Sequence, residues 1–382
     1  MKNLSGSKIR FGNLSNSDDT NRIKFYLKFI DTCLSSDIPM IIDTQNAGTV
    51  MRFLTAYLAI REGKWLMTGI ERMKKRPIGE LVNALNALGA EITFTEKPDF
   101  PPILIKGSEM FGGNIETNPN QSSQFISALM MIGPYLEDGL EIILQKKPVS
   151  APYIEMTAQL MRMYGIKVET TAKKITIPAG DYEIVEHNIE PDWSSASYWY
   201  EVAALTKNSQ IFIPGLSKTS IQGDAAVAEI YDNLGVETIF QEDGILIKSK
   251  SEFNSEFEFN FKNYPDLVPS VMATCAAKGI QLTIKGISHL KFKESDRIIS
   301  MDEELSKIGC SITRRGQLYL LSPGKLVDKV EFNTHEDHRI AMSLAPLSLL
   351  IDEVTINKPD VTIKSYPDFW KNMSELNVFT TS

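Results

Sequence analysis

Residues 76–94 read RPIGELVNALNALGAEITF, a pattern typical of a helix that runs directly into a strand. Pro77 stands where helices begin, because its fixed backbone angle suits the first turn. Apolar residues follow at helical spacing, and Gly89 predicts the end of the helix, since glycine readily adopts the left-handed backbone found there. Ile92 and Phe94 then alternate with polar residues, which indicates a strand.

This glycine-ended helix recurs along the chain. Three further segments repeat it, APYIEMTAQLMRMYGIKVET, GDAAVAEIYDNLGVETIF and ESDRIISMDEELSKIGCSIT, with stops at Gly165, Gly235 and Gly309. Successive stops, counted from Gly89, are 76, 70 and 74 residues apart. A regular period of this length indicates one structural unit copied several times.

A second type of helix lies between the glycine-ended ones and opens on polar or small residues before it becomes apolar. Its copies are 75, 71, 74 and 71 residues apart and begin near Asn46, Gln121, Asp192, Asp266 and Asp337. Strand-like stretches such as PPILIKG, LEIILQ and GILIKS fill the gaps. The sequence therefore predicts an α/β (α+β) fold in which each repeated unit mixes strands with two helices.

Composition restricts the class of protein. A chain of 382 residues with 43% hydrophobic residues is globular and long enough for two domains. No apolar run is long enough for a membrane span or a signal peptide, and the widely spaced Cys33, Cys275 and Cys310 are typical of buried thiols in a reducing compartment, so we expect a cytoplasmic protein without disulfides. A net charge of −8 argues against a nucleic-acid partner.

The two helix types do not occur equally often. The glycine-ended type has six copies if the partial ones near Asp18 and at residues 367–376 are included, whereas the second type has five. One period before Asn46 falls upstream of Met1. The sequence thus predicts that the start of the first repeat is missing.

The openings of the second helix type are candidate anion sites, because free backbone N–H groups at helix N-termini attract negative charge. One such opening is ordinarily only a cap, but several aimed at one place would bind a multiply charged anion. Cations lie at or just after the helix starts of both types: Arg52, Arg76, Arg297, Arg339 and Lys364. Lys74 and Lys75, in the same basic run as Arg76, are interpreted as a solvated turn.

Glu294, between Lys293 and Arg297, is a candidate proton shuttle, because a carboxyl group among cations can be tuned for acid–base work. The alternative is an ordinary glutamate in the first helical turn. His335 and His338 lie three residues apart, but no further ligand spacing accompanies them, and we expect no metal.

Nine motifs, in order and at matching spacing, resemble the 5-enolpyruvylshikimate-3-phosphate synthase family: NAGTVMR, RMKKRPIG, SSQF, SAPY, DWSSASY, PDLVPS, KESDR, DHRIAM and KSYPDF. The resemblance implies two lobes of repeated βαβαββ units that close over a cleft. The N-terminal lobe would span residues 1–190, with an incomplete first unit and two full ones. The C-terminal lobe, 191–382, would hold three units.

The family transfers the enolpyruvyl group of phosphoenolpyruvate to the 5-hydroxyl of shikimate 3-phosphate, releases phosphate and needs no cofactor. The resemblance implies that Asp266 is the base on that hydroxyl and that Glu294 moves a proton at the enol carbon. Shikimate 3-phosphate would be held by Ser122, Ser123, Gln124, Ser150, Tyr153, Asp266 and Lys293. Phosphoenolpyruvate would be held by Gly48, Arg76, Gln124, Arg297, Arg339 and Lys364. We expect a monomer with no membrane or nucleic-acid partner.

Two features depart from the family pattern. His289 replaces an asparagine, and the N-terminal LPxSKSxSNR segment is absent, with Ser7 and Lys8 interpreted as a loop. A catalytically impaired or dead anion-binding relative is therefore the alternative. The sister transferase acting on UDP-N-acetylglucosamine is disfavoured because its reactive cysteine has no counterpart between Cys33 and Cys275, and an RNA-end-processing relative is disfavoured by the acidic charge.

Overall fold

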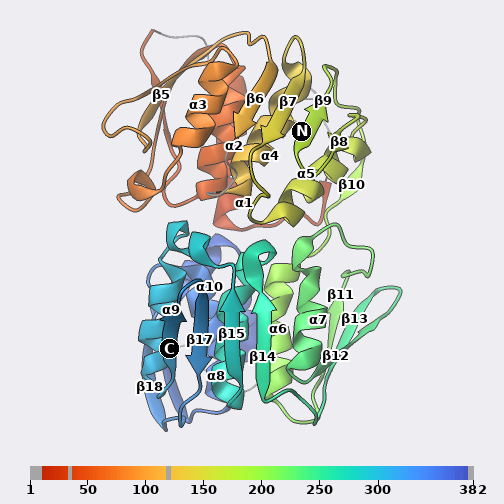
Figure 1. Cartoon of the computed structure of the whole chain (residues 1–382), viewed down its shortest axis with the longest axis vertical. Helices are drawn as coiled ribbons and strands as arrows, with labels where there is room; N and C mark the ends of the chain where they lie inside the picture. Colours follow the sequence, from red (N-terminus) through yellow and green to blue (C-terminus); the bar gives the residue numbers. More distant parts are fainter. Residues whose placement is uncertain (1–10, 33–36, 118–121, 377–382) are drawn as a thin grey trace. The chain divides into compact units, whose positions relative to one another are not determined.

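The structure of the chain, a computed structural model, describes residues 11–32, 37–117 and 122–376. The chain divides into two units, Met1–Ile189 and Glu190–Ser382, coloured red to yellow-green and green to blue in Figure 1. Within the described ranges, each helix is too short or too polar to cross a membrane.

The first unit contains two four-stranded sheets with the same strand order, β2-β3-β5-β4 and β6-β7-β9-β8, and a short parallel pair, β1 with β10. Its strands are β1 (Phe11–Gly12), β2 (Met40–Asp43), β3 (Gly63–Thr68), β4 (Glu91–Phe94), β5 (Ile103–Gly107), β6 (Gly113–Thr117), β7 (Leu140–Leu144), β8 (Glu169–Thr170), β9 (Lys174–Ile177) and β10 (His187–Asn188). Its helices are α1 (Asp18–Thr32), α2 (Gly48–Ala59), α3 (Gly79–Ala87), α4 (Ser123–Ile132) and α5 (Ala151–Met163), with 3-10 turns η1 (Met73–Lys75) and η2 (Gly133–Tyr135).

The second unit contains the sheets β14-β15-β17-β16, β11-β13-β12 and β18-β19, and Figure 1 shows β14, β15 and β17 side by side. Its strands are β11 (Gln210–Pro214), β12 (Val236–Phe240), β13 (Gly244–Ser249), β14 (Glu256–Asn260), β15 (Gln281–Lys285), β16 (Ser311–Arg315), β17 (Leu318–Ser322), β18 (Lys329–Asn333) and β19 (Glu353–Asn357). Its helices are α6 (Trp193–Leu205), α7 (Val227–Asn233), α8 (Val268–Lys278), α9 (Arg297–Ser306), α10 (His338–Leu344) and α11 (Phe369–Ser374). Its 3-10 turns are η3 (Gly223–Ala226), η4 (Phe261–Asn263), η5 (Pro265–Leu267), η6 (Ser288–Phe292), η7 (Ala345–Leu349) and η8 (Pro359–Lys364).

The predicted repeat is confirmed. Each four-stranded sheet belongs to a complete βαβαββ unit, for example β6-α4-β7-α5-β8-β9. The four predicted stops have positive φ angles, 103° at Gly89, 84° at Gly165, 92° at Gly235 and 79° at Gly309, and a strand follows each. Two details differ from expectation. α3 begins at Gly79, after Pro77, and in the described part of the second unit one sheet has four strands while the others have three and two.

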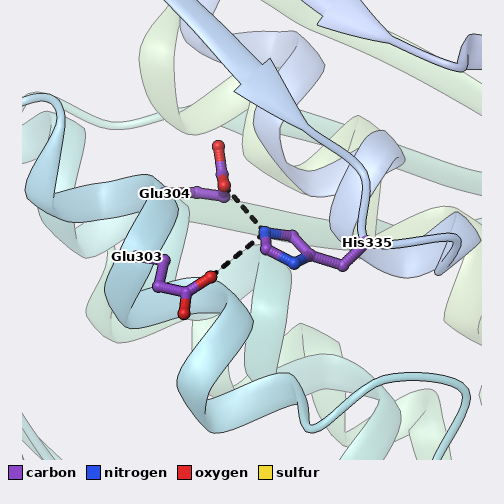
Figure 2. A group of neighbouring side chains, drawn as sticks. All are labelled: Glu303, Glu304 and His335. Carbon is purple, nitrogen blue, oxygen red and sulfur yellow. Dashed lines mark hydrogen bonds and ion pairs between the residues drawn. The ribbon is translucent and has the colours of Figure 1, made fainter.

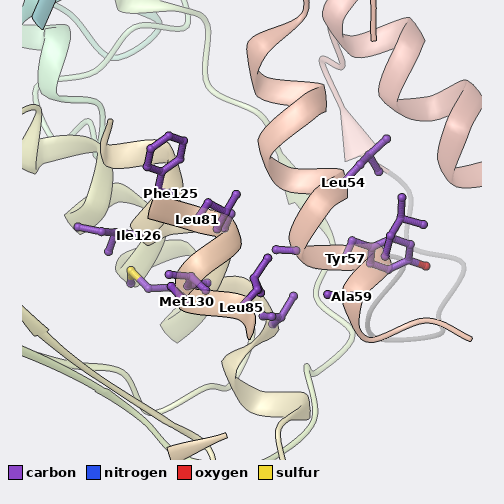
Figure 3. Close-up of a cluster of buried hydrophobic side chains, with 14 of the residues drawn as sticks. Leu54, Tyr57, Ala59, Leu81, Leu85, Phe125, Ile126 and Met130 are labelled. Carbon is purple, nitrogen blue, oxygen red and sulfur yellow. The ribbon is translucent and has the colours of Figure 1, made fainter. Parts of the chain in front are cut away.

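Helices of the second type form the interior of the repeated βαβαββ units. Nearly every residue of α2 is buried, and α4 and α8 are buried in the same way. A helix that is apolar on all sides is stable only when other elements surround it. Figure 3 shows Leu54 of α2, Leu81 of α3, and Phe125 and Met130 of α4 in one cluster of buried side chains. The buried residues of these helices nevertheless include several polar or charged ones, among them Arg52, Thr55, Ser127, Ser270 and Thr274.

The core of the second unit contains an unusual acid. Glu201 of α6 is fully buried, and neither of its carboxylate oxygens has a hydrogen-bond partner. Burial raises the pKa of Glu201 well above its ordinary value of 4.5, so the group is kept neutral. Cys275 and Cys310 are buried free thiols, as expected, whereas Cys33, Ser7 and Lys8 lie outside the described residues.

Replacing Glu201 should change how stability depends on pH. At about pH 4 the acid is neutral in both the folded and unfolded chain, but as the pH rises only the unfolded chain ionises it, which stabilises the unfolded state. We expect Glu201→Gln to leave the free energy of unfolding nearly unchanged at about pH 4 and to raise it by about 1–3 kcal/mol at about pH 8. Thermal unfolding across this range measures the effect, with the exposed Glu237→Gln as control; a gain independent of pH would contradict it.

Candidate active site

Arg297 is the centre of a buried charge cluster in the second unit. Its side chain is only 1% exposed, and its guanidinium pairs with Asp266 (2.7 Å), Glu294 (2.9 Å) and Asp337 (2.8 Å). Burial alone would lower the pKa of Arg297, but the three carboxylates outweigh it and raise that pKa. The arginine is therefore permanently charged and held in one orientation.

Helix starts bring these groups together. Arg297 is the first residue of α9, and Asp337 is the N-cap of α10, where it accepts the backbone N–H of Arg339 at 3.0 Å. Asp266 lies in η5, directly before α8. The openings predicted near Asp266 and Asp337 thus supply carboxylates to one cluster, and capping by Asp337 fixes where its charge lies.

Asp266 is the most heavily paired carboxylate of the cluster. Besides Arg297, it accepts from Arg339 Nη2 at 3.0 Å and lies 3.4 Å from Lys293 Nζ. Burial pushes the pKa of Asp266 upward, but Arg339, Lys293 and Arg297 together hold it well below its ordinary value. Asp266 is therefore an anion in this structure, and its two oxygens orient the surrounding cations.

Glu294 connects the cluster to the last cation. One of its oxygens accepts from Arg297, and the other accepts from Lys364 Nζ at 2.9 Å. Lys364 ends η8, seventy residues further along the chain. Together Lys293, Arg297, Arg339 and Lys364 carry four positive charges against three negative ones on Asp266, Glu294 and Asp337. These seven groups alone carry a charge of +1.

Three further groups surround this cluster. Asp224 is buried and accepts a hydrogen bond from the Ser194 hydroxyl at the start of α6; burial and the charge of Asp266 raise its pKa to about 6, so it takes up a proton only in mildly acidic solution. Burial, aided by Lys293, lowers the pKa of His289 to about 4, and the ring is neutral. Arg339 Nη1 donates to the hydroxyl of Tyr198 at 3.4 Å.

In the first unit, two buried arginines meet at the start of α2. A Cβ atom added to Gly48 would lie 2.3 Å from Arg52 Nη1 and 2.5 Å from Arg76 Nη2, so both guanidinium groups rest against this glycine. Arg76 also donates to the Asn46 carbonyl at 3.3 Å. A side chain at position 48 would displace the tips of these two arginines, and with glycine there the result is two cations beside a helix N-terminus, an arrangement suited to a phosphate or a carboxylate.

The openings of α4 and α5 carry the remaining predicted residues. Ser122 caps α4 by accepting the backbone N–H of Gln124, whose side chain donates to Thr49 Oγ1 of α2 at 3.1 Å. Ser123 is buried in the first turn of α4. Ser150, in the left-handed conformation (φ 54°), directly precedes α5, and Tyr153 lies in the first turn of that helix.

The structure thus brings the predicted Asp266, Lys293, Glu294, Arg297, Arg339 and Lys364 into one cluster of the second unit. It also places Gly48, Arg76 and Gln124 beside one another at the starts of α2 and α4. Sequence reasoning missed Asp337, Asp224 and Tyr198 as members of the site. The DHR motif contained Asp337, but only as a helix start, and nothing in the sequence paired it with Arg297.

Comparison with known proteins identifies the same family as the sequence motifs. A family model described as EPSP synthase (3-phosphoshikimate 1-carboxyvinyltransferase) matches residues 21–373. A relative from Bacteroides fragilis (strain YCH46), named 3-phosphoshikimate 1-carboxyvinyltransferase, is 40% identical over 337 residues, which are 87% of this chain and 82% of the relative. One from Sulfurovum sp. (strain NBC37-1), of the same name, is 32% identical and covers 98% of this chain and 92% of its own length.

Solved structures confirm the expected fold class. EPSP synthase from Acinetobacter baumannii superposes with a TM-score of 0.78 at 21% identity, over 98% of this chain and 92% of that protein. A second structure from that species gives a TM-score of 0.75. The α/β architecture of repeated βαβαββ units is therefore that of the enolpyruvyl transferases.

Removing the charge of Asp337 should destabilise the second unit. Asp337→Asn keeps an N-cap but leaves Arg297 with one buried partner fewer, so we expect the free energy of unfolding to fall by about 3 kcal/mol. Denaturant unfolding measures it. Asp296→Asn is the matched control, because Asp296 caps α9 from a half-buried position and pairs with no buried arginine in the described residues. Equal losses for both variants would contradict the proposed role of the Asp337 charge.

Proposed function

The chain belongs to the EPSP synthase family, and we propose that the residues described above carry out that family's reaction. The enolpyruvyl group of phosphoenolpyruvate is transferred to the 5-hydroxyl of shikimate 3-phosphate and phosphate is released, a step of aromatic amino acid biosynthesis. The observation that carries this assignment is the cluster around Arg297, in which each of four cations pairs with Asp266, with Glu294 or with both.

Both substrates are anions, and the cationic side chains of the site suit their phosphate and carboxylate groups. We assign to phosphoenolpyruvate the six residues Gly48, Arg76, Gln124, Arg297, Arg339 and Lys364. Arginine offers a planar fork that matches phosphate or carboxylate through two parallel hydrogen bonds. These cations would stabilise the charge that builds up on phosphate as it leaves.

Hydroxyl and amide groups suit shikimate 3-phosphate. Ser122, Ser123, Gln124, Ser150 and Tyr153 lie at the openings of α4 and α5, where backbone N–H groups and side-chain hydroxyls can share a phosphate. Asp266 and Lys293 are assigned to the ring hydroxyls, since a carboxylate accepts and an ammonium donates.

The transfer needs protons to move at two atoms. Glu294 carries a proton when both substrates are bound. As the 5-hydroxyl oxygen bonds to C2 of phosphoenolpyruvate, its proton passes to Asp266 and Glu294 gives its proton to C3. The C2–O bond to phosphate then breaks as a C3 proton returns to Glu294, which restores the double bond, and the proton on Asp266 passes to the departing phosphate. Glu294 is positioned by Arg297 and Lys364 for these steps.

The alternative of a dead anion-binding relative is disfavoured because both carboxylates assigned to proton transfer are present in one cluster with the cations. We further propose that the chain works as a monomer in the cytoplasm. The buried free thiols of Cys275 and Cys310 support a reducing compartment. Size-exclusion chromatography with light scattering tests the monomer.

Turnover by Glu294→Gln tests the assignment directly. Phosphate release from phosphoenolpyruvate and shikimate 3-phosphate should fall by about 100-fold or more, as for loss of a general acid–base group, while shikimate 3-phosphate still binds with nearly unchanged affinity. Asp296→Asn, in the same segment, should retain normal turnover. Unchanged turnover in Glu294→Gln would remove this residue from the mechanism, and binding without turnover by the unmodified chain would support the alternative.

Removing the Arg76 guanidinium should weaken phosphoenolpyruvate binding. We expect Arg76→Ala to raise the KM for phosphoenolpyruvate by about 10- to 100-fold or more, because a buried charged partner of an anion is lost. The exposed Lys75→Ala, which removes the same charge one residue away, is the control and should leave KM unchanged. Equal effects of the two variants would show that only the general positive field matters.

A further inference from the structure

A separate group of side chains lies about two turns along α9 from Arg297. Figure 2 shows Glu303 and Glu304 of that helix facing His335, which follows β18. The Nε2 atom of His335 is 2.7 Å from Glu304 Oε1 and 3.8 Å from Glu303 Oε2. One nitrogen and two carboxylate oxygens thus converge within 4.8 Å of one another.

Glu304 is held in place from its other side. Its side chain is only 1% exposed, and its Oε2 atom accepts from Lys307 Nζ at 2.6 Å and from the backbone N–H of Asn333 at 2.8 Å. These contacts leave Oε1 directed at His335. Carboxylates that bind metals are commonly oriented by such outer hydrogen bonds.

We propose that Glu303, Glu304 and His335 form a binding site for a zinc-class divalent cation. One imidazole nitrogen with two carboxylate oxygens is a donor set that Zn²⁺ accepts, whereas Mg²⁺ and Ca²⁺ prefer oxygen ligands alone. Tetrahedral ligands about 2.0–2.1 Å from zinc lie about 3.3 Å from one another. The two nitrogen–oxygen separations of 2.7 and 3.8 Å bracket that value, and all three ligand atoms lie within 4.8 Å of one another, so side-chain rotations can bring them around one ion.

The site is open on one side. Glu303 is exposed, so an ion can enter from solvent and a water molecule can occupy the fourth position. The backbone on the other side is unusual, since His335 and Glu336 both have left-handed conformations, with φ of 50° and 56°. This turn directs the imidazole toward α9. His338, which sequence spacing offered as the second ligand, lies outside the group.

A cation bound here would connect two segments that also carry the charge cluster. α9 begins with Arg297, and the segment after β18 leads directly to Asp337. The ion should therefore stabilise the second unit against unfolding, because it binds only where the folded chain brings the ligands together. This inference does not depend on the proposed reaction.

Isothermal titration with ZnCl₂ tests the site on the full chain after chelator treatment and removal of the chelator. We expect saturable binding of about one equivalent and a higher unfolding temperature, with no shift from MgCl₂. Glu303→Gln and His335→Gln should each weaken zinc binding by at least about 10-fold. Glu336→Gln, which removes the adjacent exposed carboxylate paired with Lys358, should bind as the unmodified chain does.

His335→Gln also removes the hydrogen bond to Glu304, so its unfolding temperature without metal is measured first. Glu303→Gln leaves that bond intact and keeps the test decisive if His335→Gln fails to fold. Absence of saturable zinc binding by the unmodified chain would overturn the proposal. Undiminished zinc binding by Glu303→Gln and by any folded His335→Gln would do the same, because the ion would then bind elsewhere.

Discussion

The Arg297 guanidinium, almost wholly removed from water, is tolerated only because carboxylates surround it. Asp266, Glu294 and Asp337 supply the negative charge from segments far apart in the sequence. The charge of Arg297 therefore helps to fix the positions of three segments: η5, the residues before α9 and the start of α10. Arg339 and Lys364 depend on it indirectly, since they pair with the same carboxylates.

This pairing also determines how the cluster would respond to a substrate. Each of its four cations already contacts a carboxylate, so the phosphate or carboxylate of a ligand must compete for them. The pKa of Asp266 is low because Arg339, Lys293 and Arg297 outweigh its burial. A bound anion that drew those cations away would raise that pKa. Asp266, a weak base in the free protein, would then become a better proton acceptor.

Features that depend on local sequence, such as helix ends, could be predicted from the sequence, whereas contacts between distant segments could not. The stops at Gly89 and Gly309 follow from the backbone freedom of glycine, and the spacing of such stops predicts the repeat without any tertiary information. The pairing of Arg297 with Asp337 spans forty residues, and no local pattern records it. The same holds for Glu304 and His335, which come from different elements. Arg52 was visible as a cation one helical turn after Gly48, but the approach of Arg76 to the same glycine from another segment was not.

The burial of the inner helices restricts where chemistry can occur. α2, α4 and α8 are buried along nearly their whole length, so a charged side chain on them, such as Arg52 of α2, is largely removed from water. Glu201, in the middle of α6, shows the consequence, because burial leaves it neutral. Capping groups and backbone N–H groups at the helix openings add to the few buried polar side chains, such as Arg52 and Thr274, that these helices carry. Cations from the outer helices and loops, Arg76 and Arg297 among them, therefore lie at those openings. Because the βαβαββ unit is repeated, the chain has several such openings.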